Sequence, residues 1–402
     1  MKRALLLVLL MVFAVHLPPA SAGGDEDREF RRRVDAAITA GCEHLLRTQQ
    51  PDGTWQSPYD EKWPGGATAL ACLALLVSEI NPWRDEMQKT LQWIESRKFE
   101  RTYSAAIAMM AIEACHIPPD EFKAMREDRP VEKPVRKVTP QRKAFLEWHV
   151  KMLLGGRQHD AWGYPAGPDS TSDWGGDLSN LQYALLGLKS ASRCGIEIED
   201  DAWFKVLKIL LTAQEKEGPK VRLIVSKSVD KHGYETAETR PAEVRGWRYR
   251  WPYSVKVGSS ASVVNPGPDD KPSGSMTTAG IACLAIIHSE LLRSPKYQRE
   301  IRDVSQAIHD GFAWLAANWA VDKNPGGNPV WHYYYLYGLE RAGVLGGRKW
   351  IGEHDWYREG AEYLLARQLP GGGFGDGLLD TCFALLFLRR STVPVATTGL
   401  SK

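Results

Sequence analysis

The sequence predicts an all-α protein, an (α/α)6 toroid in which six helical hairpins form an inner and an outer ring of helices. Three observations support this fold class. Six short apolar cores recur along the chain, amphipathic helices alternate with them, and turns that combine glycine with an aromatic residue join the two kinds of helix. A regular internal repeat of this kind is typical of architectures built from stacked supersecondary units.

The six apolar cores share one register. In three of them a cysteine stands first and an alanine third, as in the runs that begin at Cys72, Cys283 and Cys382. A fourth core has Gln182 in place of the cysteine, and a fifth is largely tyrosine. Because these segments are apolar on nearly all sides, they must be buried all round and form the inner ring. The cores occupy residues 72–76, 106–112, 182–188, 283–287, 333–339 and 382–386.

The helices that precede the cores are amphipathic. Residues 203–211, 312–319 and 357–365 place apolar side chains at i, i+3 and i+4 and carry Lys, Arg and Glu on the other face. This pattern predicts outer helices with one face in water. Turns at 49–55, 158–164, 246–249 and 368–374 contain glycine and an aromatic residue, so that the chain turns sharply and the ring packs between neighbouring repeats.

The repeats extend over residues 35–390, which we take as one toroid domain. Residues 116–143 are rich in proline and charge and are expected to be an exposed excursion. Residues 218–275 form a long inserted loop, which is either a lid over one ring opening or a surface decoration. Residues 23–34 are an N-terminal segment, and residues 391–402 are a C-terminal tail.

The first 22 residues resemble a signal peptide. Lys2 and Arg3 precede an apolar run from Ala4 to Val15, and Ala20-Ser21-Ala22 is a small-residue cleavage site before Gly23. We therefore expect an exported protein, periplasmic or secreted, with no transmembrane segment in the mature chain. The net charge of +2 falls to zero once Lys2 and Arg3 are removed, so that nothing favours a nucleic-acid partner. The six cysteines lie mainly in apolar runs and are expected to be buried free thiols.

A helix followed by Gln-x-x-Gly-x-Trp and an apolar helix, as at Gln50–Trp55 and its variants, resembles the repeats of squalene and hopene cyclases and of the protein prenyltransferase β subunit. The chain looks closest to uncharacterised exported bacterial members of that superfamily. The resemblance covers residues 35–390 and implies the toroid fold. It does not imply one activity, because a fold supports many functions.

The terpene cyclases of this superfamily protonate an alkene with an Asp-x-Asp-Asp motif at the start of an inner helix. In the repeat register Asp380 matches the last Asp of that motif, but Gly377 and Leu379 replace the first Asp and the proton donor. The third repeat keeps only the first Asp, as Asp177. Terpene cyclase activity is therefore not supported, the catalytic residues are unknown, and whether the protein is an enzyme stays open.

The protein prenyltransferases bind zinc through Asp-x-Cys and a histidine. Asp380 and Cys382 resemble the Asp-x-Cys pair, but the position of the histidine corresponds to Trp331. The nearest histidine, His332, lies one residue away, which is about 100° around a helix. A zinc site at Asp380, Cys382 and His332 is thus an alternative. In the competing interpretation no cofactor is bound, Asp380 caps a helix and Cys382 fills the core.

A third hypothesis is a glycan-active toroid. Asp160, Asp169, Asp173 and Asp177 cluster in the sequence with aromatic residues at 162, 164 and 174. Carboxylates beside aromatic platforms suit the binding or hydrolysis of sugars, although such a cluster also suits a polar rim with helix caps.

The starts of the inner helices are expected to face a central cavity, which is the default site for a ligand. We predict a toroid that binds an apolar, isoprenoid-like small molecule or a protein partner there. The predicted cavity residues are Asp177, Asn180, Gln182, Trp331, His332, Tyr333 and Asp380.

Overall fold

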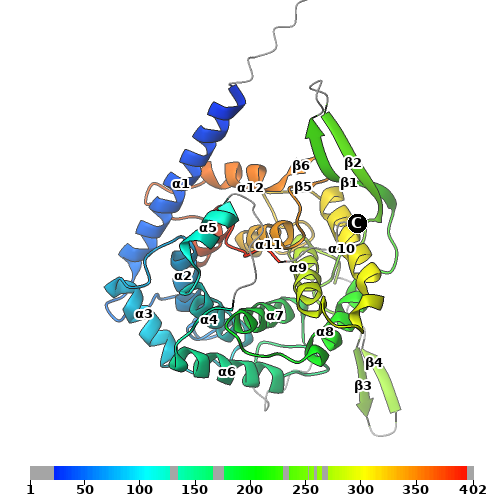
Figure 1. Ribbon diagram of the computed structural model, residues 1–402, viewed down its shortest axis with the longest axis horizontal. Coiled ribbons are helices and arrows are strands. Elements are labelled where there is room, and N and C mark those ends of the chain that lie inside the picture. The colour runs from blue at the N-terminus through cyan, green and yellow to red at the C-terminus, as the bar shows by residue number, and fades with distance from the viewer. Residues whose placement is uncertain are drawn as a thin grey trace, which may run out of the picture.

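The computed structural model describes residues 22–126, 135–165, 176–229, 235–251, 253–257, 260–264 and 270–395. Six helices form a closed inner ring, seen nearly along its axis in Figure 1. Each inner helix packs against the next, and the last packs against the first. The inner helices are α2 (Gly66–Val77), α4 (Thr102–Ala114), α7 (Leu178–Arg193), α9 (Gly274–Leu291), α11 (His332–Leu345) and α13 (Leu378–Leu388).

Six further helices surround this ring and complete the hairpins (Figure 1). The two concentric layers confirm the predicted all-α toroid, and every predicted apolar core lies in an inner helix. The outer helices are α1 (Ala22–Thr48), α3 (Asp85–Glu95), α6 (Pro140–Gly155), α8 (Asp200–Ala213), α10 (Ile301–Ala317) and α12 (Trp356–Leu365).

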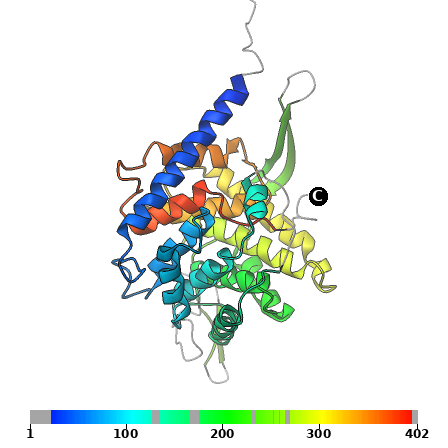
Figure 2. The ribbon, with the colours of Figure 1, turned by 60° about the vertical axis from the view of Figure 1, so that its left-hand side comes forward.

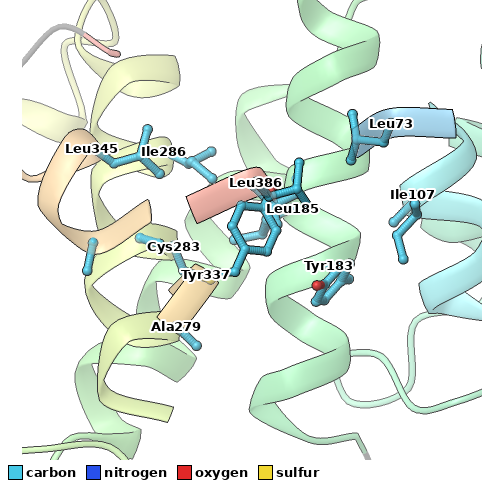
Figure 3. Packing of buried hydrophobic residues seen from close by; sticks show 14 of the residues in the cluster. Leu73, Ile107, Tyr183, Leu185, Ala279, Cys283, Ile286, Tyr337, Leu345 and Leu386 are labelled. Atoms are coloured by element: carbon cyan, nitrogen blue, oxygen red, sulfur yellow. The ribbon is translucent and has the colours of Figure 1, made fainter. Parts of the chain in front are cut away.

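The hydrophobic core fills the space between the helices of both layers. Figure 3 shows side chains such as Leu73, Ile107, Cys283 and Tyr337 meeting there from different inner helices. Cys283 is fully buried, as are Cys72 and Cys382, and all six cysteines are free. The cysteines thus act as small core residues, as the sequence predicts.

The glycine-aromatic turns connect the outer helices to the inner ones through one repeated hydrogen bond. The indole N–H of Trp55 donates to the carbonyl of Leu45 at 2.8 Å, and that of Trp162 donates to Leu153 at 2.7 Å. Trp247 makes the same bond to Leu210 at 2.9 Å. Each acceptor lies in the last turn of an outer helix, where backbone carbonyls lack intrahelical partners. The folded-back indole therefore caps the helix and fills the core.

The glutamines of the same turns join neighbouring outer helices. Gln49, after α1, donates to the carbonyl of Glu86 in α3 at 3.0 Å. Gln214, after α8, donates to Ala307 in α10 at 2.9 Å. The connecting glutamine of the first turn is thus Gln49, one residue before the Gln50–Trp55 motif.

The excursion at 116–143 is more firmly packed than the sequence suggests. It contains the short helix α5 (Pro119–Arg126). Arg136 is buried and forms ion pairs with Glu121 and, at 3.4 Å, with Glu113 of α4. The expectation of an exposed segment is wrong for these residues, because the buried charges pair with one another. Residues 127–134 lie outside the described part of the chain.

The inserted segment at 218–275 contains two antiparallel hairpins. The first joins β1 (Lys220–Val229) to β2 (Glu235–Glu243), and the second joins β3 (Tyr253–Val257) to β4 (Ser260–Val264). The first hairpin packs against the outer helix α10 and against β5 (Trp350–Ile351), which pairs with β6 (His354–Asp355). It thus lies outside the ring (Figure 1) and does not cover an opening.

The predicted N-terminal segment at 23–34 is part of α1, whose first half extends beyond the ring in Figure 2. Phe30 and Val34 are buried, so the toroid begins earlier than residue 35. Of the predicted signal peptide, only Ala22 is described, and of the predicted tail, residues 391–395. In the described part of the chain, no helix is both long and apolar enough to cross a membrane.

Candidate functional site

A cavity of about 440 Å³ lies at the mouth of the ring, at the end where the inner helices begin. Each of the six hairpins places an aromatic side chain in its wall. Three come from the connections that lead to inner helices, one from the 3-10 helix η2 (Pro329–Trp331), and two from inner helices themselves. In chain order these residues are Trp63, Tyr103, Tyr164, Tyr249, Trp331 and Phe383.

Trp63 stands at the centre of this aromatic wall. Its ring centroid lies 5.4 Å from Tyr59, 6.0 Å from Tyr164, 6.1 Å from Tyr103 and 6.3 Å from Trp331. The rings are tilted or edge-on to Trp63, the arrangement that aromatic quadrupoles favour. The cavity therefore offers broad, flat and rigid apolar faces at its rim.

Polar side chains stand between the rings. Asp60 accepts a hydrogen bond from the backbone N–H of Ser57 at 2.8 Å, and Asp270 accepts from the backbone of Tyr249 and Arg250 at 3.2 and 3.0 Å. Both carboxylates line the cavity beside Lys62, Lys271, Asn324 and Asn328. The backbone bonds fix the carboxylates and leave further acceptor positions open.

The floor of the cavity is apolar and includes Leu70, Ile107, Met276 and Leu379. Tyr334 also reaches it from α11, with its hydroxyl 3.1 Å from the side-chain amide of Gln182.

Arg341 is fully buried in the packing of the same helix. Its guanidinium carbon lies 3.9 Å from the ring centroid of Tyr337. Turning the amide of Gln182 lets its oxygen accept from Arg341 at 2.7 Å while its nitrogen donates to Tyr334. Gln182, Tyr334 and Arg341 therefore form one buried hydrogen-bonded group, in which Nη1 of Arg341 has no partner among the described residues.

Asp177 lies behind the wall of the cavity. It is the N-cap of α7 and accepts from the backbone N–H of Asn180 at 2.9 Å. Its carboxylate also accepts from the hydroxyl of Ser179 at 2.5 Å and from the side-chain amide of Asn180 at 2.7 Å. Asp177 is only 6% exposed, and burial raises its pKa above the ordinary range of aspartate.

The predicted cavity residues fall into different places. Trp331 lines the cavity. Asn180 and Gln182 are completely buried in the helix packing, and Asp177 lies behind the wall. Tyr333 is also buried, and burial raises its pKa to about 12. Gln182 contacts Tyr334 of α11, which is not its neighbour in the inner ring, so its side chain points into the packed interior of the ring.

The three residues proposed for zinc do not come together as a metal-binding group. His332 places Nε2 2.9 Å from the carbonyl of Val321, and burial lowers its pKa. Asp380 accepts from the backbone N–H of Asp376 in its own turn at 2.9 Å. Cys382 is completely buried, which raises the pKa of its thiol. Throughout the described ranges, no group of three His, Cys, Asp or Glu side chains could hold a metal ion.

The acidic cluster at 160–177 is also divided. Asp160 lies 3.8 Å from the ammonium group of Lys205 on the surface. Trp162 is completely buried and serves as a helix cap, so it offers no platform for a ligand. Tyr164 does line the cavity. Asp169, Asp173 and Trp174 lie outside the described residues.

Sequence reasoning missed most of the wall. Tyr59 and Trp63 precede α2, whereas Tyr249 and Asp270 belong to the inserted segment. A signal for Trp63 exists in the Trp-Pro-Gly-Gly run that ends at Gly66, the first residue of α2. No periodic pattern marks Tyr249 or Asp270, because an irregular connection brings them to the ring.

No family model matches this sequence, and no curated protein matches it significantly. Among solved structures, the chain is similar to an inactive variant of the GH76 α-1,6-mannanase of Salegentibacter sp. in complex with α-1,6-mannotriose. The TM-score is 0.52 at 11% identity, over 89% of this chain and 98% of that one. A second structure of the same mannanase, whose description names no variant, has a TM-score of 0.50 at 10% identity, over 89% of this chain and 98% of that one. For a type II terpene cyclase from Scytonema, the TM-score is 0.47 at 11% identity, over 90% of this chain and 98% of that one. At these identities the likeness shows the toroid fold alone.

Proposed function

We propose that this protein is a saccharide-binding toroid that holds its ligand in the aromatic cavity at the mouth of the ring. The observation that carries the proposal is the composition of the cavity lining, which combines flat rings from every hairpin with carboxylate, ammonium and amide groups. A pyranose ring has an apolar face of C–H groups and a polar edge of hydroxyls. Such a ligand can stack on the aromatic rings while its edge meets the polar groups.

The polar groups favour a saccharide over a hydrocarbon. Asp60, Lys62 and Asp270 line the cavity and are partly or fully exposed to solvent. A hydrocarbon that filled the cavity would remove water from these groups without replacing its hydrogen bonds, which costs free energy at each group. Hydroxyl groups of a sugar would replace those bonds.

The neighbouring structures offer a precedent of the same fold. In the mannanase complex, a toroid holds the saccharide α-1,6-mannotriose. Two carboxylates, Asp60 and Asp270, line the present cavity, which is the number that most glycoside hydrolases use. Our proposal is therefore binding of a saccharide, and hydrolysis is a further outcome that the same assays would detect.

A second candidate is an apolar, isoprenoid-like ligand. The apolar floor that includes Leu70, Ile107 and Met276 favours it. Such a ligand would need a polar end for the rim, so an isoprenoid alcohol is the appropriate comparison.

We further propose that the protein acts outside the cytoplasm, after removal of Met1–Ala22. The basic start, the apolar run and the small-residue cleavage site support this. Mass spectrometry of the protein from the exported fraction should find a chain that begins at Gly23. Recovery of the full-length chain from the cytoplasm would contradict export.

The proposed function is tested with the chain from Gly23 onward and two sets of probes. One set contains α-1,6-mannotriose and other linear tri- and tetrasaccharides, and the second contains the isoprenoid alcohols farnesol and geranylgeraniol. Binding to the native state raises the melting temperature by an amount that grows with the logarithm of the ligand excess, and isothermal titration then gives the affinity. We expect at least one saccharide to bind and the alcohols not to compete with it. Binding of the alcohols alone would transfer the proposal to the second candidate.

A further inference from the structure

Two tyrosine hydroxyls meet at the inner part of the cavity. Tyr103 of α4 and Tyr334 of α11 both line the cavity, and their hydroxyl oxygens lie 3.5 Å apart. The side-chain amide of Gln182 lies 3.1 Å from the hydroxyl of Tyr334. In the described part of the structure, neither hydroxyl has a further hydrogen-bond partner. The two tyrosines therefore connect the cavity to the polar group that is buried in the interior of the ring.

Arg341 fixes the direction of the Gln182 amide. A guanidinium group only donates hydrogen bonds, so the amide group must turn its oxygen toward Arg341. In that orientation Nη2 and Nε of Arg341 lie 2.7 and 3.1 Å from the oxygen of Gln182. Both residues are completely buried, so that bulk water does not compete for these bonds. The NH2 group of Gln182 consequently donates to the hydroxyl oxygen of Tyr334.

The pair of tyrosines is left with a surplus of donors. Gln182 already donates to the oxygen of Tyr334, and each of the two hydroxyls carries one proton of its own. Only one of these two protons fits between the two oxygens, which lie 3.5 Å apart. Whichever hydroxyl donates to the other, at least one proton is left for an acceptor in the cavity.

The side chains around this donor are apolar. Ile107 lies one turn after Tyr103 on the same face of α4. Phe383 stands edge-on to Tyr334, with ring centroids 5.8 Å apart. Both Ile107 and Phe383 line the cavity and are less than 9% exposed. A ligand group that enters here must therefore combine an acceptor oxygen with an apolar surface.

We propose that the inner part of the cavity is a subsite for the acetamido group of an N-acetylhexosamine. The carbonyl oxygen of that group accepts a hydrogen bond from the pair of Tyr103 and Tyr334, and its methyl group packs against the apolar side chains. This inference rests on the proposed function and narrows it to saccharides that contain N-acetylated amino sugars. Gln182 and Arg341 are positioning residues, because they act through Tyr334.

The experiment compares two trisaccharides that differ only at C2 of each ring. Tri-N-acetylchitotriose carries an acetamido group at that carbon and cellotriose a hydroxyl, and both are β-1,4-linked. We expect isothermal titration of the chain from Gly23 onward to show that the acetylated trisaccharide binds at least about tenfold more tightly. One hydrogen bond and one buried methyl group together account for a difference of that size.

Variants of the donor pair locate the subsite. The combination of Tyr103→Phe and Tyr334→Phe removes both hydroxyls and should weaken binding of tri-N-acetylchitotriose about fivefold, with little effect on cellotriose. Gln182→Glu keeps both tyrosines and the shape of the side chain. Its carboxylate accepts from Arg341 and from Tyr334, so Tyr334 no longer offers a proton to the cavity. The preference for the acetylated trisaccharide should then fall, which a loss of packing alone would not produce.

The control is Tyr357→Phe, which removes a hydroxyl that donates to Leu388 at 2.7 Å away from the cavity. It should keep the tenfold preference. If the wild type binds saccharides of the panel but binds tri-N-acetylchitotriose no more tightly than cellotriose, the inference is overturned and the proposed function stands. An undiminished preference in the folded double variant of Tyr103 and Tyr334 would also overturn it. If the wild type binds no saccharide at all, both are overturned.

Discussion

The side-chain amide of Gln368 donates a hydrogen bond to the carbonyl oxygen of Ala37 at 2.8 Å, and so joins the end of the last outer helix to the first. It donates a second bond to Gly372 in its own turn at 2.9 Å. Gln49 and Gln214 likewise join neighbouring outer helices within the ring. The toroid is therefore closed by the same kind of glutamine hydrogen bond that connects its successive repeats.

Replacing Gln368 by alanine should loosen this closure. We expect Gln368→Ala to lower the free energy of unfolding by about 1–3 kcal/mol, because two partly buried carbonyls lose their donor. Urea denaturation followed by circular dichroism measures the change. The control is Gln298→Ala, whose amide contacts only Leu292 in an exposed turn. Equal stability of the two variants would show that the bond does not contribute to closure.

Gly280 is a test of packing between α9 and the folded-back Trp247. A Cβ atom at Gly280 would lie 2.3 Å from the indole ring, far inside van der Waals contact. In a helix, alanine is usually more stable than glycine by about 1 kcal/mol. Whether Gly280→Ala stabilises or destabilises the protein therefore depends on the cost of the clash with the indole. We expect Gly280→Ala to destabilise the protein by about 1–3 kcal/mol in thermal and urea unfolding.

Gly371→Ala is the matched control for this substitution. The nearest atom to its added Cβ is in His44, at 3.9 Å, and it should change stability little. If Gly280→Ala leaves the free energy of unfolding unchanged, α9 and the indole of Trp247 can move apart without loss of stability, which would contradict this prediction.

Glu340 gives the protein a specific dependence on pH. It is completely buried, its oxygens accept from the backbone and hydroxyl of Thr392 at 2.9 and 2.6 Å, and burial raises its pKa to about 7. The carboxyl group of Glu340 releases its proton near pH 4.5 in the unfolded chain and near pH 7 in the folded chain. The contribution of Glu340 to the free energy of unfolding is therefore fully present below pH 4.5 and is lost as the pH rises to 7. The loss is at most about 3 kcal/mol.

Comparison with Glu340→Gln isolates this contribution, since other titrating groups are common to both proteins. The difference in unfolding free energy between wild type and variant should change steadily from about pH 4.5 to about 7.5 and favour the wild type at the acidic end. A difference that does not vary with pH would contradict the raised pKa of Glu340.

The buried thiols provide a further test of the core. Burial raises the pKa of Cys72, Cys283 and Cys382, and thiolate is the reactive form. We expect these cysteines to resist a thiol reagent such as DTNB at about pH 8 in the native state, and all six to react in denaturant. Rapid native labelling of Cys283, identified by mass spectrometry, would indicate that the inner ring opens.

The fold could be predicted because its units repeat. Six apolar cores had to be buried helices, and the turn from Gln49 to Trp55 recurs with the same roles for glutamine and tryptophan. The hairpins at 220–243 and 253–264 could not be predicted in this way, because they occur once and pack outside the repeat. The burial of Arg136 was also hidden, since a charged, proline-rich segment normally lies in water.

The candidate site was predicted in place but not in detail. A cavity was predicted at the mouth of the ring, and Trp331 lines the cavity found there. Asn180 and Gln182 start an inner helix, yet both are completely buried, because side chains such as Tyr334 fill the ring interior around them. Trp63 and Tyr249 reach the cavity from connecting segments, whose course follows from closure of the whole ring.

The most direct test of the central claim compares two tryptophan variants. Trp63 stands at the centre of the aromatic wall, whereas Trp83 is 75% exposed and does not line the cavity. Isothermal titration with the tightest-binding saccharide should show affinity reduced at least about tenfold in Trp63→Ala, because a stacking platform is lost, and unchanged affinity in Trp83→Ala. Equal affinity of a folded Trp63→Ala variant and the wild type would place the saccharide elsewhere and contradict the account.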